Sequence, residues 1–127
     1  MEKLRPLPLQ FWRSDSGREP TRDWFRELPH LDRAVLGHDL KRVQYGWPIG
    51  MPLVKSLGGG LWEVRSSLPS NREARALFIV DDDGIVVLHG FIKKSQKTPL
   101  NELQLARKRM KEFDDENCSK KSWDTFG

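Results

Sequence analysis

The sequence is poor in the residues and segments that mark secreted, metal-binding and membrane proteins. Cys118 is the only cysteine, so no disulfide can form within the chain, and it has neither a Cys/His zinc pattern nor a paired redox motif. The first residues, Met1 to Pro6, lack the apolar segment of a secretory signal. No stretch reaches the roughly 18 apolar residues of a transmembrane helix. These absences predict a cytoplasmic protein without a membrane segment, in which Cys118 has no special role.

What the chain does contain is an excess of positive charge. Its 127 residues suit one domain with one core, and its formal net charge is +4 with a pI near 9.4. Such a balance favours an acidic partner, for example RNA, DNA or an acidic polypeptide. Many of the cations crowd into one C-terminal stretch, namely Lys93, Lys94, Lys97, Arg107, Lys108, Arg109 and Lys111.

Hydrophobic spacing and turn residues predict an α+β fold. Two helices are expected before the meander of strands, at residues 20–28 and from 29 or 30 to 45, and a third from Pro99 with Thr98 as its N-cap. A short edge strand is expected at 7–12, and a meander at 61–66, 74–80 and 85–92, with a further strand possible at 54–57. The elements predict one antiparallel sheet with helices packed on it, in a single domain of residues 1–116 followed by a polar tail, 117–127.

Three of these strands carry cations near one end. Side-chain alternation places His89, Phe91 and Lys93 on one face of the last strand, and Leu88, Gly90, Ile92 and Lys94 on the other. Arg65 lies near the end of its strand and Arg75 near the start of the next. In a meander these positions are neighbours, so Arg65, Arg75 and the end of the 85–92 strand are predicted to meet.

Such a cluster suits the cleavage of RNA without a metal. The reaction needs a base for the 2′-hydroxyl, positive charge for the phosphorane and an acid for the leaving 5′-oxygen. Arginine and lysine supply the charge, and histidine can transfer the proton. The aromatic rings of Phe91 and Trp62 are candidates for stacking on a base.

Each of these residues also has a purely structural interpretation. A histidine within an apolar run, such as His89, is often a hydrogen-bonded core residue, and Phe91 and Trp62 suit the core. Arg65 and Arg75 can be exposed strand cations or partners of Glu63 and Glu73, while the lysines can form a solvated face. The residues do not define a nuclease without further information. The triple glycine Gly58-Gly59-Gly60 is not a phosphate loop, since no Gly-Lys-Ser/Thr follows it.

Several segments in the right order give the chain a resemblance to the RelE/ParE-type toxins of type II toxin–antitoxin systems, and most of all to the phage-derived HigB-like branch. The likeness covers roughly residues 11–112. It rests on the segments Pro52-Leu53-Val54-Lys55, Gly59-Gly60-Leu61-Trp62-Glu63-Val64-Arg65, Leu88-His89-Gly90-Phe91-Ile92-Lys93-Lys94 and Gln96-Lys97-Thr98-Pro99, with Glu102 and Ala106-Arg107. The resemblance implies a RelE-like fold, similar to small microbial ribonucleases, with two N-terminal helices, an antiparallel sheet and one C-terminal helix.

The resemblance also implies roles for individual residues. By position, it implies catalytic roles for Arg65, Arg75, Lys93 and Lys94, to which the chemistry of histidine adds His89. The expected RNA-binding residues are Lys55, Lys97 and the stacking candidates Trp62 and Phe91. Glu63 stands where better-known RelE members have a lysine, so it either removes a cation or supplies a general base. Those members also have a tyrosine beyond the basic pair, whereas the only tyrosine here is Tyr45. The proton-transfer role therefore falls to His89, Glu63 or a lysine.

The function implied by the resemblance is that of a toxin that cuts mRNA on the ribosome, without metal or cofactor, and so inhibits translation. Its expected partners are mRNA, the ribosome and a helix-turn-helix, HigA-like antitoxin, with operator DNA bound indirectly through the antitoxin complex. Two other functions stay open. One is ParE-like inhibition of an enzyme such as DNA gyrase without catalysis, and the other is a relic that only binds an antitoxin or nucleic acid.

Overall fold

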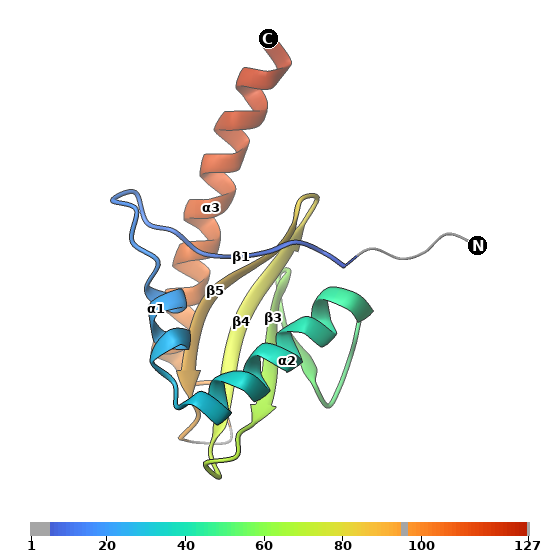
Figure 1. Ribbon diagram of the computed structural model, residues 1–127. Helices are drawn as coiled ribbons and strands as arrows, with labels where there is room; N and C mark the ends of the chain where they lie inside the picture. The colour runs from blue at the N-terminus through green and yellow to red at the C-terminus, as the bar shows by residue number, and fades with distance from the viewer. Residues whose placement is uncertain (1–5, 95–96, 127) are drawn as a thin grey trace, which may run out of the picture.

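The computed structural model describes residues 6–94 and 97–126, with side chains as far as Glu116. The elements follow the order β1 (Leu9–Phe11), α1 (Pro20–Glu27), α2 (His30–Gly46), β2 (Val54–Gly58), β3 (Leu61–Ser67), β4 (Glu73–Asp81), β5 (Gly84–Ile92) and α3 (Leu100–Phe126). The α+β class is confirmed, and Figure 1 shows α1 and α2 on one side of the sheet and α3 on the other. None of the helices in the described part of the chain combines the length and apolarity needed to cross a bilayer.

The sheet has five strands in the order β1-β5-β4-β3-β2. Strands β2 to β5 form antiparallel pairs, whereas β1 pairs parallel with β5. The prediction of an antiparallel sheet is therefore corrected at this edge. The possible strand at 54–57 is confirmed as β2. A tight turn connects it to β3, and Gly58, Gly59 and Gly60 permit this turn because all three have positive φ angles.

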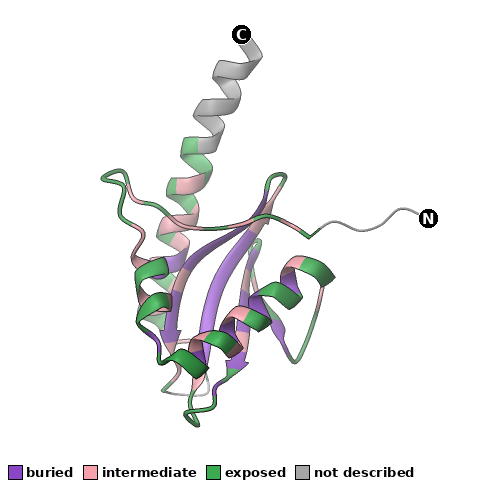
Figure 2. Ribbon diagram, viewed as in Figure 1, coloured by how far each residue is buried: buried purple, intermediate pink, exposed green. Residues whose placement is uncertain are grey.

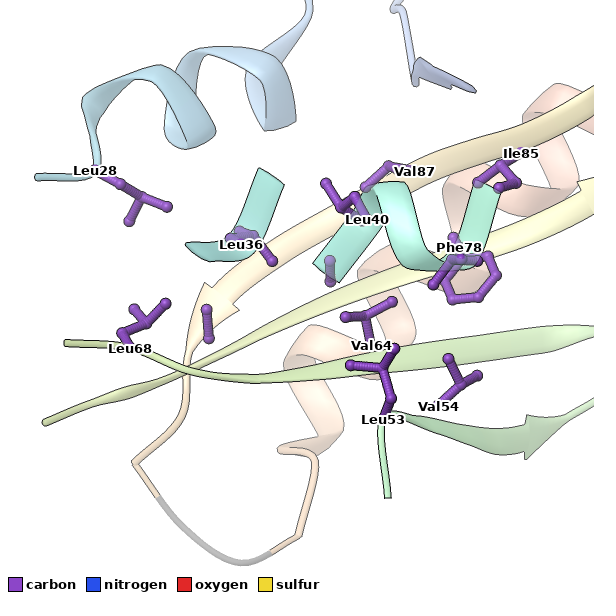
Figure 3. Packing of buried hydrophobic residues seen from close by; sticks show 13 residues of the cluster. Leu28, Leu36, Leu40, Leu53, Val54, Val64, Leu68, Phe78, Ile85 and Val87 are labelled. Carbon is purple, nitrogen blue, oxygen red and sulfur yellow. The ribbon is translucent and has the colours of Figure 1, made fainter. Parts of the chain in front are cut away.

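Prolines and apolar spacing explain where the N-terminal helices lie. Pro20 occupies the first turn of α1, and the helix ends before Leu28-Pro29, where the proline disfavours helical geometry in its predecessor. Helix α2 buries Leu36, Leu40 and Val43 on one face. These side chains lie against buried residues of β3, β4 and β5, as Figure 3 shows for Val64, Phe78 and Val87 among others.

A second apolar cluster fills the space between the sheet and α3. Its buried members are Leu61, Leu77, Ile79, Val86, Leu88, Phe91 and Ala106. Strands β4 and β5 are consequently covered on both faces, which explains their nearly continuous apolar sequence and their burial in Figure 2. Gly90 is required here because a Cβ atom would overlap the ring of Trp24 on α1.

Two details depart from the sequence prediction. The register between β4 and β5 shifts at Leu77/Phe78, which pair with His89 and Val87. Leu88 thus lies in a β-bulge and packs in the α3-side cluster, not on the face opposite His89 as strict alternation predicted. Helix α3 begins at Leu100 and continues past Glu116, where the sequence predicted a polar tail. The side chain of Cys118 lies outside the described residues.

Candidate functional site

The cation-bearing ends of β3, β4 and β5 meet at one end of the sheet, at the bottom of Figure 1. Arg65 of β3 is paired with Arg75 of β4, and Arg75 is paired with Phe91 of β5. Directly paired residues point to the same face of the sheet. Because Phe91 belongs to the cluster under α3, Arg65 and Arg75 also lie on the α3 side of the sheet. The prediction that Arg65 and Arg75 are neighbours near the end of the last strand is confirmed.

Arg75 is a buried residue in this arrangement and not an exposed cation. Its side chain is 2% exposed, and its Nη1 donates to Glu63 Oε1 at 3.2 Å while its Nε donates to Glu73 Oε2 at 2.8 Å. Thr98, which precedes α3, donates from Oγ1 to the other oxygen of Glu63 at 2.6 Å. The pairing of Arg75 with Glu63 and Glu73, left open as an alternative by the sequence, is what the structure shows.

Glu73 is the point at which the cations converge. Besides the bond from Arg75, its Oε2 lies 3.6 Å from Lys93 Nζ, and its carboxylate also interacts electrostatically with Arg65. Partial burial by itself raises the pKa of Glu73, but the hydrogen bond from Arg75 and the three positive charges outweigh it and hold the pKa below its ordinary value. Glu73 is therefore an ionised carboxylate held by cations on β3, on β4 and directly after β5.

His89 lies on the same face and pairs with the first turn of α3. Its Nε2 is 3.0 Å from Glu102 Oε1, and its ring stacks on Phe91 with centroids 5.8 Å apart. An ionised carboxylate can only accept a hydrogen bond, so an ionised Glu102 places the proton on Nε2 and leaves the lone pair of a neutral ring on Nδ1. The side chain of His89 is 14% exposed, so it is neither fully buried nor open to solvent.

The other predicted residues divide between the two faces of the sheet. Lys55 pairs with Glu63 in the sheet register and is exposed on the edge strand β2, and Lys94 and Lys97 are exposed beyond β5. Trp62 lies on the opposite face, where its ring meets Trp47 edge-on at 5.0 Å, so the fold does not bring it to the cations. Phe91 is only 6% exposed and packs in the core.

Two of the basic residues on α3 hold the helix to the rest of the protein. Arg107 donates to the carbonyl oxygens of Leu57 and Gly58. Arg109 donates to the carbonyl of Leu88 at 2.8 Å and lies over the ring of Trp12, and burial lowers its pKa from the ordinary value. These contacts engage two cations of the basic C-terminal stretch with the sheet and the segment after β1, so their side chains are not simply solvated.

A cleft of about 540 Å³ opens beside Arg65 and Glu73, between α2 and the end of β3. It is bounded by one wall of helix residues and one of strand and loop residues, namely Val35, Asp39, Arg42, Pro52, Leu53, Arg65, Ser67 and Glu73. The volume falls within the range of small-ligand sites. Arg65 and Glu73 belong both to this cleft and to the group of charged strand residues, so the two features are continuous.

Sequence reasoning did not assign functional roles to Glu73, Thr98 or Glu102. Glu102 had a detectable signal, because it lies four residues before Ala106 and so shares the buried face of α3. Glu73 carried no signal beyond its proximity to Arg75.

Among the described residues, no three His, Cys, Asp or Glu side chains are grouped so that they could hold a metal ion. The site is therefore built from cations, carboxylates and one histidine.

Comparison with known proteins gives one clear relationship. No curated protein matches the chain. The profile of a family described as "Phage derived protein Gp49-like (DUF891)" matches residues 23–111, which include the end of α1, all of α2 and β2 to β5, the start of α3 and every charged residue of the site described above. This family is related to the RelE-type toxins. The match covers well over half of the sequence, and the chain therefore belongs to the phage-derived Gp49-like family.

Proposed function

We propose that this protein is the toxin of a type II toxin–antitoxin pair, of the HigB-like branch, and that it inhibits translation by cutting mRNA. The observation that carries the proposal is the convergence of Arg65, Arg75 and Lys93 on one carboxylate beside an open cleft. A place that holds a carboxylate with three cations is also suited to a phosphodiester. Membership of the Gp49-like family and the sheet order with two preceding helices support a RelE-like toxin.

Burial and hydrogen bonding distinguish two candidates for proton transfer, Glu63 and His89. Glu63 is 1% exposed, and its two oxygens accept bonds from Arg75 and Thr98, so it is poorly placed to receive a proton from RNA. His89 is better placed, because Glu102 fixes its ring while leaving Nδ1 to accept the proton. We therefore assign proton transfer to His89. Stabilisation of phosphorane charge is assigned to the cations around the Glu73 carboxylate, which are Arg65, Arg75 and Lys93, with Lys94 beside them.

The proposed reaction is a transesterification within the RNA chain. The 2′-hydroxyl gives its proton to His89, and the 2′-oxygen forms a bond to phosphorus while the bond from phosphorus to the 5′-oxygen breaks. The leaving oxygen takes a proton from a lysine or from water. The products are a 2′,3′-cyclic phosphate and a 5′-hydroxyl. The choice of mRNA on the ribosome as substrate follows from the resemblance to RelE-type toxins.

One observation favours the alternative of a non-catalytic, ParE-like inhibitor. Glu63 and Glu73 offset two of the three charges of Arg65, Arg75 and Lys93, which reduces the net charge of this group to +1. A surface of this kind can also bind a protein through matched charges. The two activities differ in their products, since inhibition of gyrase leaves mRNA intact and damages DNA.

Induced expression without antitoxin, followed by mapping of mRNA 5′ ends, tests the proposal. Growth should stop, and new 5′-hydroxyl ends should appear within translated frames. The Arg65→Ala, Lys93→Ala variant should lose about tenfold to a thousandfold of the cleavage rate while keeping its fold. The matched control is Arg13→Ala, Lys41→Ala, which removes two exposed cations elsewhere. Intact mRNA together with DNA damage would contradict the nuclease function and support the ParE-like inhibitor.

A further inference from the structure

The most unusual feature of the site is that its cations already hold an anion. Glu73 belongs to the protein, yet its carboxylate is bound as a ligand would be, by Arg75 Nε at 2.8 Å and by Lys93 Nζ at 3.6 Å, with Arg65 as the third positive charge. Its side chain is 27% exposed and lines the 540 Å³ cleft. The anion position is therefore reachable from solvent.

The neighbouring glutamate shows that Glu73 is not needed to neutralise the buried arginine. Glu63 lies 3.2 Å from Arg75 Nη1 and is fully buried, so Arg75 keeps a charged partner inside the protein whatever Glu73 does. The two carboxylates thus differ in kind. Glu63 is part of the core, whereas Glu73 lies at its margin, between Arg75 and the two more accessible cations.

We propose that Glu73 occupies the position of an RNA phosphate and competes with it, so that the free protein binds phosphodiesters weakly until this carboxylate moves aside. The proposal rests on the proposed function, because it takes RNA as the ligand of this site. Displacing the carboxylate requires only rotation of one partly exposed side chain. The incoming phosphate then accepts from Arg65, Arg75 Nε and Lys93, and the adjoining cleft takes the nucleoside attached to it.

The alternative is that Glu73 merely fixes the ends of β4 and β5, since Lys93 N donates to the Glu73 backbone carbonyl and its Nζ approaches the side chain. The two roles make different predictions for the Glu73→Gln variant. A glutamine keeps the size of the side chain and an oxygen to accept from Arg75, but it removes the charge. If Glu73 is structural, the variant should bind RNA as tightly as the unmodified protein or less tightly. If Glu73 competes with the phosphate, the variant should bind RNA more tightly.

The test is the binding of a short RNA with all 2′-hydroxyls methylated, which the protein cannot cleave. Dissociation constants should be measured by calorimetry for the full chain and for Glu73→Gln, which should bind about tenfold more tightly because a like charge beside the phosphate is gone. The control is Asp83→Asn, which changes net charge equally in the β4–β5 turn at the other end of β4, about 26 Å away along the strand. Its affinity should stay close to that of the unmodified protein.

The location of binding is checked in the same samples. The Arg75 Nε–H resonance should shift when the RNA is added, because its acceptor changes from Glu73 to phosphate. Equal affinity in Glu73→Gln and Asp83→Asn, or absence of RNA binding in both, overturns the proposal. If Glu73→Gln binds RNA more tightly but the protein cuts no mRNA in cells, the anion site is supported and the proposed nuclease function is wrong.

Discussion

The guanidinium of Arg75 and the carboxylate of Glu63 lie 3.2 Å apart on adjacent strands, with side chains that are 2% and 1% exposed. Thr98 donates to the second oxygen of Glu63, so the link between β5 and α3 is tied to the same pair. A charge pair in such a dry position is costly to break, because the remaining charge loses its partner and cannot regain water. The pair therefore belongs to the architecture that supports the site.

The first prediction concerns the stability of this pair. Arg75→Ala should lower the free energy of unfolding by about 3–5 kcal/mol, since Glu63 is left buried and charged. Arg75 is 2% exposed, so the loss is that of a core residue and not of a surface cation. Urea denaturation should also show that Glu63→Gln added to Arg75→Ala recovers part of the loss. A stability equal to that of the unmodified protein for Arg75→Ala would mean that Glu63 finds other partners.

The main features of the fold could be predicted from sequence because local signals agreed with one another. Pro20 and Pro29 delimit α1, apolar spacing defines α2, and Asp81-Asp82-Asp83-Gly84 separates two apolar strands. The parallel pairing of β1 with β5 left no local signal, because it joins residues far apart in the chain. The bulge at Leu88 was equally hidden, since it depends on which partner residue each strand position meets.

The site was predicted less completely than the fold. The rule that neighbouring strands of a meander meet was enough to bring Arg65 and Arg75 together. It gave no information on how deeply each side chain is buried, and this burial makes Arg75 a core residue whereas Arg65 faces the cleft. The contact from His89 to Glu102 depends on how α3 packs on the sheet, which the spacing of residues within either element does not specify.

The second prediction concerns His89. If this residue accepts the proton, His89→Gln should reduce mRNA cleavage by about 10²–10⁴-fold and leave the unfolding midpoint close to that of the unmodified protein. His38→Gln, at an exposed position of α2, is the matched control. If His89 is only a hydrogen-bonded core residue, the variant should instead lose about 1–3 kcal/mol of stability and continue to cut mRNA.

The third prediction concerns Glu102, which orients the His89 ring. Glu102→Gln keeps a hydrogen-bonding group at 3.0 Å but allows the amide to donate as well as accept, so the ring is no longer held in one tautomer. Cleavage should therefore fall, but less than in His89→Gln, and the double variant should be no worse than His89→Gln. Single-turnover cleavage rates of the three variants provide the measurement. Additive losses would show that the two residues act independently.

The fourth prediction concerns acid stability. Glu73 and Asp32 both have pKa values held below the ordinary values of 4.5 and 3.8. For Asp32, burial raises the pKa, but hydrogen bonds from Ser70 and Arg72 and the charge of Arg72 outweigh it. Because both groups bind protons more weakly when folded, their contribution to stability is present above the ordinary values. That contribution is lost as pH falls through the lower folded values.

Urea denaturation between neutral pH and about pH 3 measures this effect. The unmodified protein should lose stability as the pH falls below the ordinary carboxyl values. Glu73→Gln and Asp32→Asn should each have a smaller loss over the same interval, because one linked group is missing. Asp83→Asn, in the exposed turn between β4 and β5, should keep the full loss. An identical pH dependence in all four proteins would assign the acid sensitivity to other groups.

The fifth prediction concerns the antitoxin, proposed to be a helix-turn-helix, HigA-like protein encoded beside this one. Lys94 and Lys97 are exposed beyond β5, and Lys93 lies next to them with an 18% exposed side chain. A partner that covers this basic end of the sheet should present carboxylates, so that association is accelerated by electrostatic attraction and slows as salt rises. Lys93→Glu, Lys94→Glu should associate about tenfold more slowly, with a weaker dependence on salt.

The control for this experiment reverses two charges on other surfaces. Arg13→Glu, Lys41→Glu alters exposed residues before α1 and on α2 and changes the net charge by the same amount. Stopped-flow mixing with the antitoxin should show a much smaller effect for this variant, because steering depends on charge near the contact surface and screening removes the effect of distant charges. If both pairs slow association equally, the antitoxin responds to net charge. If neither does, it docks by apolar contact elsewhere, for example against α1 near Trp24 and Phe25.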